Sequence, residues 1–192
     1  MSTLIRPAQK NDALHVAALV DIAGHGIEAE FWRDNVDDDQ SPIAAARRLI
    51  IEDETLPYHL SKAFILEVDG DVAGLMVGGL VPAAKKIDAE FPRYFAPLLE
   101  LENLAVGFWA VIGVAVYHEF RGRGLARELL DHAEILARRS KAKGLSIVVE
   151  DTNTPAIKLY RNWGFKDRET RPWLPFNGRT GPANWVLLTR SF

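Results

Sequence analysis

Residues 114–126 read VAVYHEFRGRGLA and give the clearest indication of the fold. An apolar strand leads into a loop with two glycines, and the loop opens a helix whose apolar residues recur at helical spacing. Glycines let a backbone approach a ligand closely. The first N–H groups of a helix have no internal partner and lie at its positive end. The stretch therefore predicts an anion site for a phosphate or pyrophosphate, with Arg121 and Arg123 as additional charged donors.

Two other nucleotide-binding loops are compared with this stretch. A Walker loop requires GxxxxGK[ST], which the chain lacks. The dinucleotide fingerprint GxGxxG is partly matched by residues 122–127, and the strand after the helix ends in Glu150. Its third small residue is replaced by Arg127, however, and five residues separate Val116 from Gly122 where a tight turn is expected. An NAD-binding site is therefore the less favoured alternative.

On both sides of this stretch, apolar periodicity predicts an α/β (α+β) domain with a mixed sheet of about six to seven strands flanked by helices. The expected strands are 3–6, 63–68, 72–81, 109–116, 145–150, 165–170 and 185–189. The expected helices are 14–22 capped by Asn11-Asp12, 27–32, 42–51 capped by Ser41, 125 to the basic run before Gly144, and 155–163 capped by Thr154. Three prolines limit the regular structure expected in the insertion-like segment 82–104.

Composition narrows the class of protein. At about 150 residues per domain, the 192-residue chain is expected to form one domain, residues 1–192. The absence of cysteine excludes disulfides and a covalent cysteine intermediate, and the five histidines show no metal-ligand spacing, so no metal is expected. The apolar runs fall short of the ~20 residues of a membrane span. With no signal sequence at its start, the chain is expected to be cytoplasmic.

Charge is unevenly distributed along the chain. The net charge of −3 argues against a general nucleic-acid binder. Acidic residues outnumber basic ones over 28–54, which favours a cationic substrate, although Asp37-Asp38-Asp39 is better explained as a solvated loop. Basic residues outnumber acidic ones over 118–144, around the predicted anion site.

Two motifs, in order and separated by a helix and a strand, make the chain resemble a known family. The first is [QR]-x-x-G-x-[GA], present as residues 121–126, RGRGLA. The second is an asparagine after the next strand, Asn153, followed by a helix that ends LYRNWGF at residues 159–165. The chain resembles the GNAT superfamily of acyl-CoA-dependent N-acyltransferases over essentially its whole length. The resemblance implies a central mixed, mostly antiparallel twisted sheet flanked by helices.

The resemblance also implies a cofactor site. Acetyl-CoA would be the co-substrate, and no metal is implied. Its pantetheine arm would run along Val114, Ala115 and Val116 and contact Asn153. A backbone N–H near Val114 would polarise the thioester carbonyl. The pyrophosphate would lie on the amides of Arg121, Gly122, Arg123, Gly124, Leu125 and Ala126.

Catalytic roles follow from the same resemblance. Tyr160 matches the family tyrosine that contacts CoA and protonates the departing thiolate, although a tyrosine here could also simply pack between helix and sheet. The attacking amine must be neutral, and Glu102 is the candidate base. Glu100 and Glu150 are further carboxylates near strand ends. Trp32 falls where the family shapes its acceptor pocket, and its alternative role is that of a core aromatic.

The implied reaction is acetyl transfer from acetyl-CoA to a primary amine. Without a cysteine to carry the acetyl group, direct attack in a ternary complex is expected. The acceptor is a small-molecule or peptide amine, with neither nucleic acid nor membrane as a partner. A non-catalytic acyl-CoA sensor of the same fold is the alternative. The bulky apolar residues of segment 82–104 could cap the acceptor site or form a homodimer interface.

Overall fold

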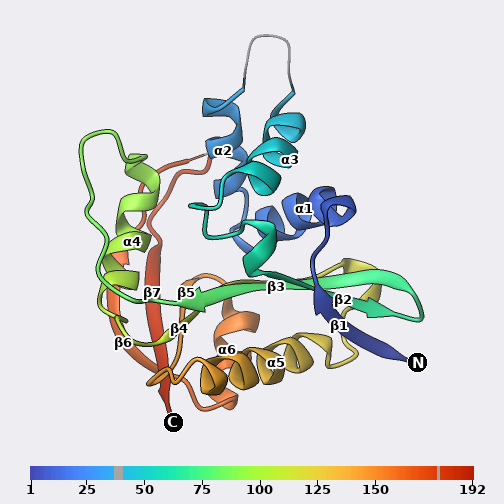
Figure 1. Cartoon of the computed structure of the whole chain (residues 1–192). Helices are drawn as coiled ribbons and strands as arrows, with labels where there is room; N and C mark the ends of the chain where they lie inside the picture. Colours follow the sequence, from blue (N-terminus) through green and yellow to red (C-terminus); the bar gives the residue numbers. More distant parts are fainter. Residues whose placement is uncertain (37–40, 177) are drawn as a thin grey trace. The chain divides into compact units, whose positions relative to one another are not determined.

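A computed structural model describes residues 1–36, 41–176 and 178–192 (Figure 1). The strands are β1 Thr3–Pro7, β2 Ala63–Val68, β3 Asp71–Leu80, β4 Trp109–Val116, β5 Gly144–Glu150, β6 Lys166–Pro172 and β7 Asn184–Ser191. The α-helices are α1 Ala13–Ala23, α2 Ile27–Asp34, α3 Pro42–Glu52, α4 Ala96–Asn103, α5 Leu125–Arg139 and α6 Thr154–Asn162. Short 3-10 turns are η1 Lys10–Asp12, η2 Leu60–Lys62, η3 Arg93–Phe95 and η4 His118–Phe120. The acidic run Asp37-Asp38-Asp39 lies outside the described residues.

The strands form one sheet in the order β1-β2-β3-β4-β5-β7-β6. Strands β1, β2 and β3 pair antiparallel, as do β5 with β7 and β6 with β7. Strand β4 pairs parallel with β5 over Trp109–Val111 and Leu145–Ile147. A parallel neighbour requires a crossover, and α5 lies between these two strands in the chain. The predicted α/β fold with a mixed, mostly antiparallel sheet is confirmed.

The chain divides into two compact units. The first comprises Met1–Gly79 and Ile112–Ile135, and the second comprises Leu80–Val111 and Leu136–Phe192. In the first unit, α1, α2 and α3 lie on one side of β2 and β3, and α5 lies on the other side (Figure 1). Each unit is described by itself below.

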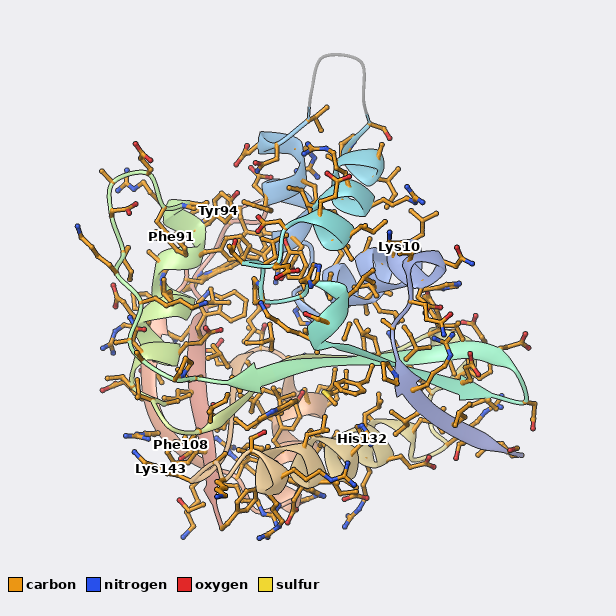
Figure 2. All side chains as sticks on the ribbon, in the orientation of Figure 1. Lys10, Phe91, Tyr94, Phe108, His132 and Lys143 are labelled. Atoms are coloured by element: carbon orange, nitrogen blue, oxygen red, sulfur yellow. The ribbon has the colours of Figure 1, made fainter. Side chains whose placement is uncertain are left out.

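Strand alternation explains the two layers of the first unit. In β2, the buried Ala63 and Ile65 belong to the core formed with α1 and α3. The intervening Phe64 faces α5, where its ring lies 5.1 Å from that of His132, which is labelled in Figure 2. Successive side chains of a strand point to opposite faces. The sequence of β2 therefore supplies an apolar surface to helices on both sides.

Strand β3 approaches β4 closely at a glycine. A Cβ atom placed on Gly74 would lie 2.8 Å from the carbonyl oxygen of Ala115 and 3.3 Å from Val116. The amide of Tyr117 donates to the carbonyl of Ala73 at 2.9 Å, which fixes the end of β4 beside β3. The absence of a side chain at Gly74 thus allows the strand that precedes the glycine-rich loop to lie against β3.

Two predicted helix caps require correction. Asp12 is the residue before α1, but its carboxylate accepts from the amide of Gln9 at 2.7 Å and from Arg6, so it does not cap α1. Helix α6 begins at Thr154, and its cap is Asn153, whose Oδ1 accepts from the amide of Ala156. The predicted Ser41 cap of α3 is confirmed, because its hydroxyl accepts from the amide of Ala44.

The second unit contains a helix in the segment predicted to be mostly irregular. Helix α4 packs against β5, β6 and β7 (Figure 1). Pro97 falls within the first turn of α4, where a missing amide hydrogen costs no hydrogen bond. The prediction for segment 82–104 is therefore wrong over its last third, because Pro97 lies in the first turn of a helix and does not break one. No helix of the described residues is long and apolar enough to cross a membrane.

The contact at Gly74 leads to a stability prediction. We expect Gly74→Ala to lower the free energy of unfolding by about 1–3 kcal/mol, because the new methyl group meets the backbone of Ala115. Gly79→Ala, on the same strand with open space around it, should change the free energy of unfolding by less than about 1 kcal/mol. Urea unfolding of both variants measures this difference, and equal effects would contradict the assignment.

Candidate functional site

The glycine-rich loop has a backbone that L-residues rarely adopt. Strand β4 ends at Val116, η4 follows, and α5 begins at Leu125. Gly122 and Gly124 have φ angles of 77° and 81°, in the left-handed region. No atom lies within 4 Å of a Cβ placed on either residue, so the conformation rather than crowding requires glycine. The loop is therefore open on the side where these side chains would stand.

The start of α5 leaves backbone donors beside this open loop. The amides of Arg127 and Glu128 donate to the carbonyl of Gly124 at 2.9 and 3.3 Å, which begins the helical hydrogen-bonding pattern. Amides before that point in a helix have no intrahelical partner. The amide of Arg121, in contrast, already donates to His118 at 3.2 Å. Unpaired amides at a helix start bind a phosphate or pyrophosphate well.

The two arginines of the loop hold its shape. The Nε of Arg121 donates to the carbonyl of Val116 at 3.0 Å, which ties the loop to the end of β4. A terminal nitrogen of Arg123 donates to the carbonyl of Glu119 at 3.0 Å, and its guanidinium lies over the ring of Phe120. Both residues are exposed and keep their positive charge beside the loop. Their predicted contact with an anion stays a prediction.

The end of β4 also contacts α1 within the first unit. A Cβ atom on Gly113 would lie 3.3 Å from the Cβ of Ala23, at the C-terminus of α1. Val114 follows and is half-buried, whereas Ala115 and Val116 are buried. The last turn of α1 therefore lies beside the strand segment predicted to hold the pantetheine arm.

In the second unit, the structure places Tyr160 on α6. Its side chain is 6% exposed, and its ring lies 5.9 Å from that of Phe165 in an edge-on arrangement. Burial raises the pKa of the Tyr160 phenol well above its usual range. The hydroxyl therefore carries its proton at neutral pH. The aromatic packing is observed, and the general-acid role stays a prediction.

The candidate bases of the second unit differ in their partners. Glu102 is half-buried on α4, and burial raises the pKa of its carboxyl, although the charge of Lys85 opposes this shift. Glu100 is exposed and forms an ion pair of 2.9 Å with Arg171. Glu150 is 2% exposed and accepts two hydrogen bonds from Arg179, at 2.8 and 3.1 Å. The pairing of Glu100 and Glu150 leaves Glu102 as the candidate of the three for proton transfer.

Two residues of α2 lie in the first unit near the end of α1. Trp32 is 4% exposed in the core shared by α1 and α3, so its packing role is observed, and its predicted contact with an acceptor stays a prediction. Sequence reasoning missed Glu28, whose burial raises the pKa of its carboxyl to about 8. In the sequence, Glu28 is notable only as an acidic residue in the first turn of a helix. Such a residue is expected to have a solvent-exposed side chain, so the sequence does not predict its burial. Among the described residues, no cluster suited to a metal ion is found.

Comparison with known proteins identifies the family. The chain belongs to the acetyltransferase (GNAT) family, whose model matches residues 25–165. No curated protein matches the chain. A solved structure described as an acetyltransferase is 24% identical, with a TM-score of 0.65 and 98% of each chain covered. An N-acetyltransferase from Staphylococcus aureus Mu50 is 20% identical, with a TM-score of 0.63, covering 97% of this chain and 100% of that one.

A third structure was solved with a ligand. It is a GNAT family acetyltransferase from Elizabethkingia anophelis with acetyl-CoA bound, 16% identical, with a TM-score of 0.58 and coverage of 99% of this chain and 98% of that one. At these identities, the three structures establish that the chain shares their fold.

The loop geometry leads to a binding prediction. We expect Gly124→Val to weaken acetyl-CoA binding by roughly tenfold or more, because it strains a left-handed residue and fills the open side of the loop. Gly70→Val is the control, since Gly70 has a φ of 97° and open surroundings in the β2–β3 turn. Both variants should lose comparable stability, and calorimetry should show weaker binding for Gly124→Val alone. Equal affinities would exclude the loop as the pyrophosphate site.

Proposed function

We propose that the protein is an N-acetyltransferase that moves the acetyl group of acetyl-CoA directly to a primary amine in a ternary complex. One observation carries this proposal: the loop with left-handed Gly122 and Gly124 leads from β4 into α5 in a chain of the acetyltransferase (GNAT) family. An open loop with unpaired amides fits a pyrophosphate, and CoA carries one. Acetyl-CoA is bound in a structural neighbour with the same fold.

The proposed contacts to acetyl-CoA follow the chain through this region. The backbone of Val114, Ala115 and Val116 would hydrogen-bond the pantetheine arm, with Asn153 as a further contact. The amides of Gly122 to Ala126 would hold the pyrophosphate. Since the amide of Arg121 is engaged with His118, we assign its guanidinium rather than its amide to the electrostatics of the site.

The chemistry requires a neutral amine and a stabilised oxyanion. The amine nitrogen attacks the acetyl carbonyl carbon, a C–N bond forms, and the C–S bond breaks with its electron pair leaving on sulfur. A backbone N–H near Val114 would donate to the carbonyl oxygen as negative charge develops there. The absence of cysteine supports direct transfer rather than an acetyl-thiol intermediate on the protein.

We assign proton delivery to Tyr160. The phenol is protonated when the thiolate forms and so has a proton to give, and its raised pKa favours its return to the neutral form afterwards. A phenol in hydrogen-bond contact with the sulfur can transfer that proton as the C–S bond breaks. Glu102 is the base suggested by the sequence, and its raised pKa brings the carboxyl closer to the working pH.

The proposed acceptor is a cationic amine. The protein itself is proposed to act in the cytoplasm. The excess of acidic residues over 28–54 supports this acceptor, since it favours positively charged ligands. The apolar segment before α4 is a second acceptor-side candidate, and Figure 2 labels Phe91 and Tyr94 there. The rings of Tyr94 and Phe95 lie 5.0 Å apart and provide an aromatic surface for a ligand or a second copy of the chain.

A turnover assay tests the proposed function. Release of CoA thiol is measured with spermidine, phenethylamine, an amino sugar and a peptide with a free N-terminus. We expect transfer to at least one amine, and we expect Tyr160→Phe to lower kcat for it by roughly a hundredfold with little change in acetyl-CoA affinity.

Tyr58→Phe is the matched control, because Tyr58 is also a buried tyrosine but lies in the first unit's core. An unchanged kcat in Tyr160→Phe would remove Tyr160 from the mechanism. Acetyl-CoA binding by the wild type without transfer to any of the amines would favour the acyl-CoA sensor instead.

A further inference from the structure

The start of α2 carries a carboxylate with one buried oxygen that has no hydrogen-bond partner. Glu28 is in the first turn of this helix and is half-buried as a residue. Its Oε2 atom, however, is sealed from solvent and has no hydrogen-bond partner. It lies against the α1–α2 turn, because a Cβ placed on Gly24 would be 2.1 Å from this oxygen. The carboxylate thus fills the space that a side chain at Gly24 would occupy.

The charges around Glu28 do not compensate it. Asp21 acts on the carboxyl with the same sign of charge. Asp21 accepts a hydrogen bond from the amide of Ala29 at 3.0 Å and interacts with Arg33. Arg33 in turn pairs with Glu30 at 2.6 Å. Burial beside a like charge therefore favours the neutral acid, and a pKa of about 8 keeps Glu28 protonated at pH 7.

Two other buried carboxylates are paired with arginines, which makes Glu28 different from them. Glu150 accepts from Arg179, and Asp12 accepts from Arg6 at 2.7 and 3.0 Å. An ion pair of that kind satisfies the carboxylate inside the folded chain. A buried carboxylate with no cation costs stability unless a ligand supplies the cation.

The position of Glu28 relative to β4 indicates that its ligand is the acceptor amine. Ala23, the residue before Gly24, contacts Gly113, and Val114 comes next in β4. All of these residues belong to the first unit. Glu28, in the first turn of α2, therefore packs against the α1–α2 turn, which adjoins the strand segment where we place the acetyl carbonyl. An amine that attacks this carbonyl has to arrive beside β4.

A second unpaired polar atom lies on the same helix. The Nε1 of Trp32 is buried and has no hydrogen-bond partner. Residues four apart share one face of a helix, so α2 presents an unpaired acceptor and an unpaired donor on one face. Packing by apolar side chains alone would bury neither a carboxyl group nor an indole N–H. A polar ligand that reaches this face satisfies both atoms.

We propose that Glu28 binds the acceptor amine and removes its proton, which makes Glu28, in place of Glu102, the general base of the proposed transferase. The inference rests on the proposed function. A rotation of the half-buried side chain brings the carboxylate to the incoming ammonium group. The neutral acid first releases its proton to solvent, and the resulting carboxylate pairs with the ammonium. The carboxylate then takes one proton from the ammonium, which leaves a neutral amine whose lone pair attacks the carbonyl carbon. The second proton lost from nitrogen after attack replaces, through solvent, the proton that Tyr160 gives to the CoA thiolate, and Glu28 releases its own proton to solvent.

This assignment has a defined pH dependence. Ammonium binding releases the proton of Glu28, so binding tightens as pH rises toward about 8 and levels off above it. Besides Glu28, the charged and titratable groups on the adjoining elements are His15 and Asp21 of α1, His25 of the turn, Glu30, Arg33 and Asp34 of α2, and Arg47, Arg48 and Glu52 of α3. Glu102 differs from Glu28, because Lys85 acts on it with an opposite charge.

Glu28→Gln tests the proposal, with Glu30→Gln as the matched control on the same helix. With the amine that the wild type acetylates best, we expect Glu28→Gln to lower kcat/KM by roughly a hundredfold at about pH 7.5. The deficit should shrink at about pH 9.5, where more of the free amine is neutral without a base. Acetyl-CoA affinity should match the wild type. A deficit no larger than that of Glu30→Gln, or equal at both pH values, would overturn the proposal.

An infrared measurement separates failure of this inference from failure of the proposed function. Absence of transfer by a wild type that binds acetyl-CoA contradicts the transferase proposal. Independently, the wild type at pH 7 should show a protonated-carboxyl band that Glu28→Gln removes, and saturating spermidine or phenethylamine should abolish it. A missing band, or one that neither amine changes, would overturn the assignment of Glu28 to amine binding.

Discussion

The backbone of the loop between β4 and α5 is the constraint from which the rest of the site follows. Gly122 and Gly124 take left-handed conformations that a β-carbon would strain, and this turns the chain from strand into helix while leaving the first amides of α5 unpaired. Arg121 fixes the loop to the end of β4. Gly74 in turn lets β3 approach β4 closely enough to support it. The proposed pyrophosphate site is thus a property of backbone geometry.

The pairing of buried charges divides structural from functional carboxylates. Asp12 and Glu150 are satisfied by arginines within the folded chain, and such pairs hold segments together. Glu28 has a buried oxygen without a partner, beside Asp21. Folding alone does not account for this arrangement, because a nearby cation or an apolar residue would be more stable there. We therefore interpret the cost at Glu28 as linked to ligand binding, as often happens at functional sites.

Much of the fold was predictable because its signals are local. Neighbouring residues alone determine the strand alternation, the Ser41 cap and the glycines of the loop, and each of these signals predicts the observed element. Segment 82–104 was mispredicted, since a proline can begin a helix as well as end one. Glu28 was missed for a different reason. Its burial depends on the α1–α2 turn packing over it, a tertiary contact that an acidic helix start does not reveal.

The loop between β4 and α5 is proposed to bind a CoA thioester and not a dinucleotide. Isothermal titration of protein freed of carried-over ligand, with acetyl-CoA, CoA and NADH in parallel, tests it most directly. We expect saturable one-to-one binding of both CoA species and no heat of binding with NADH. Binding of NADH alone, or of none of the three ligands, would contradict it.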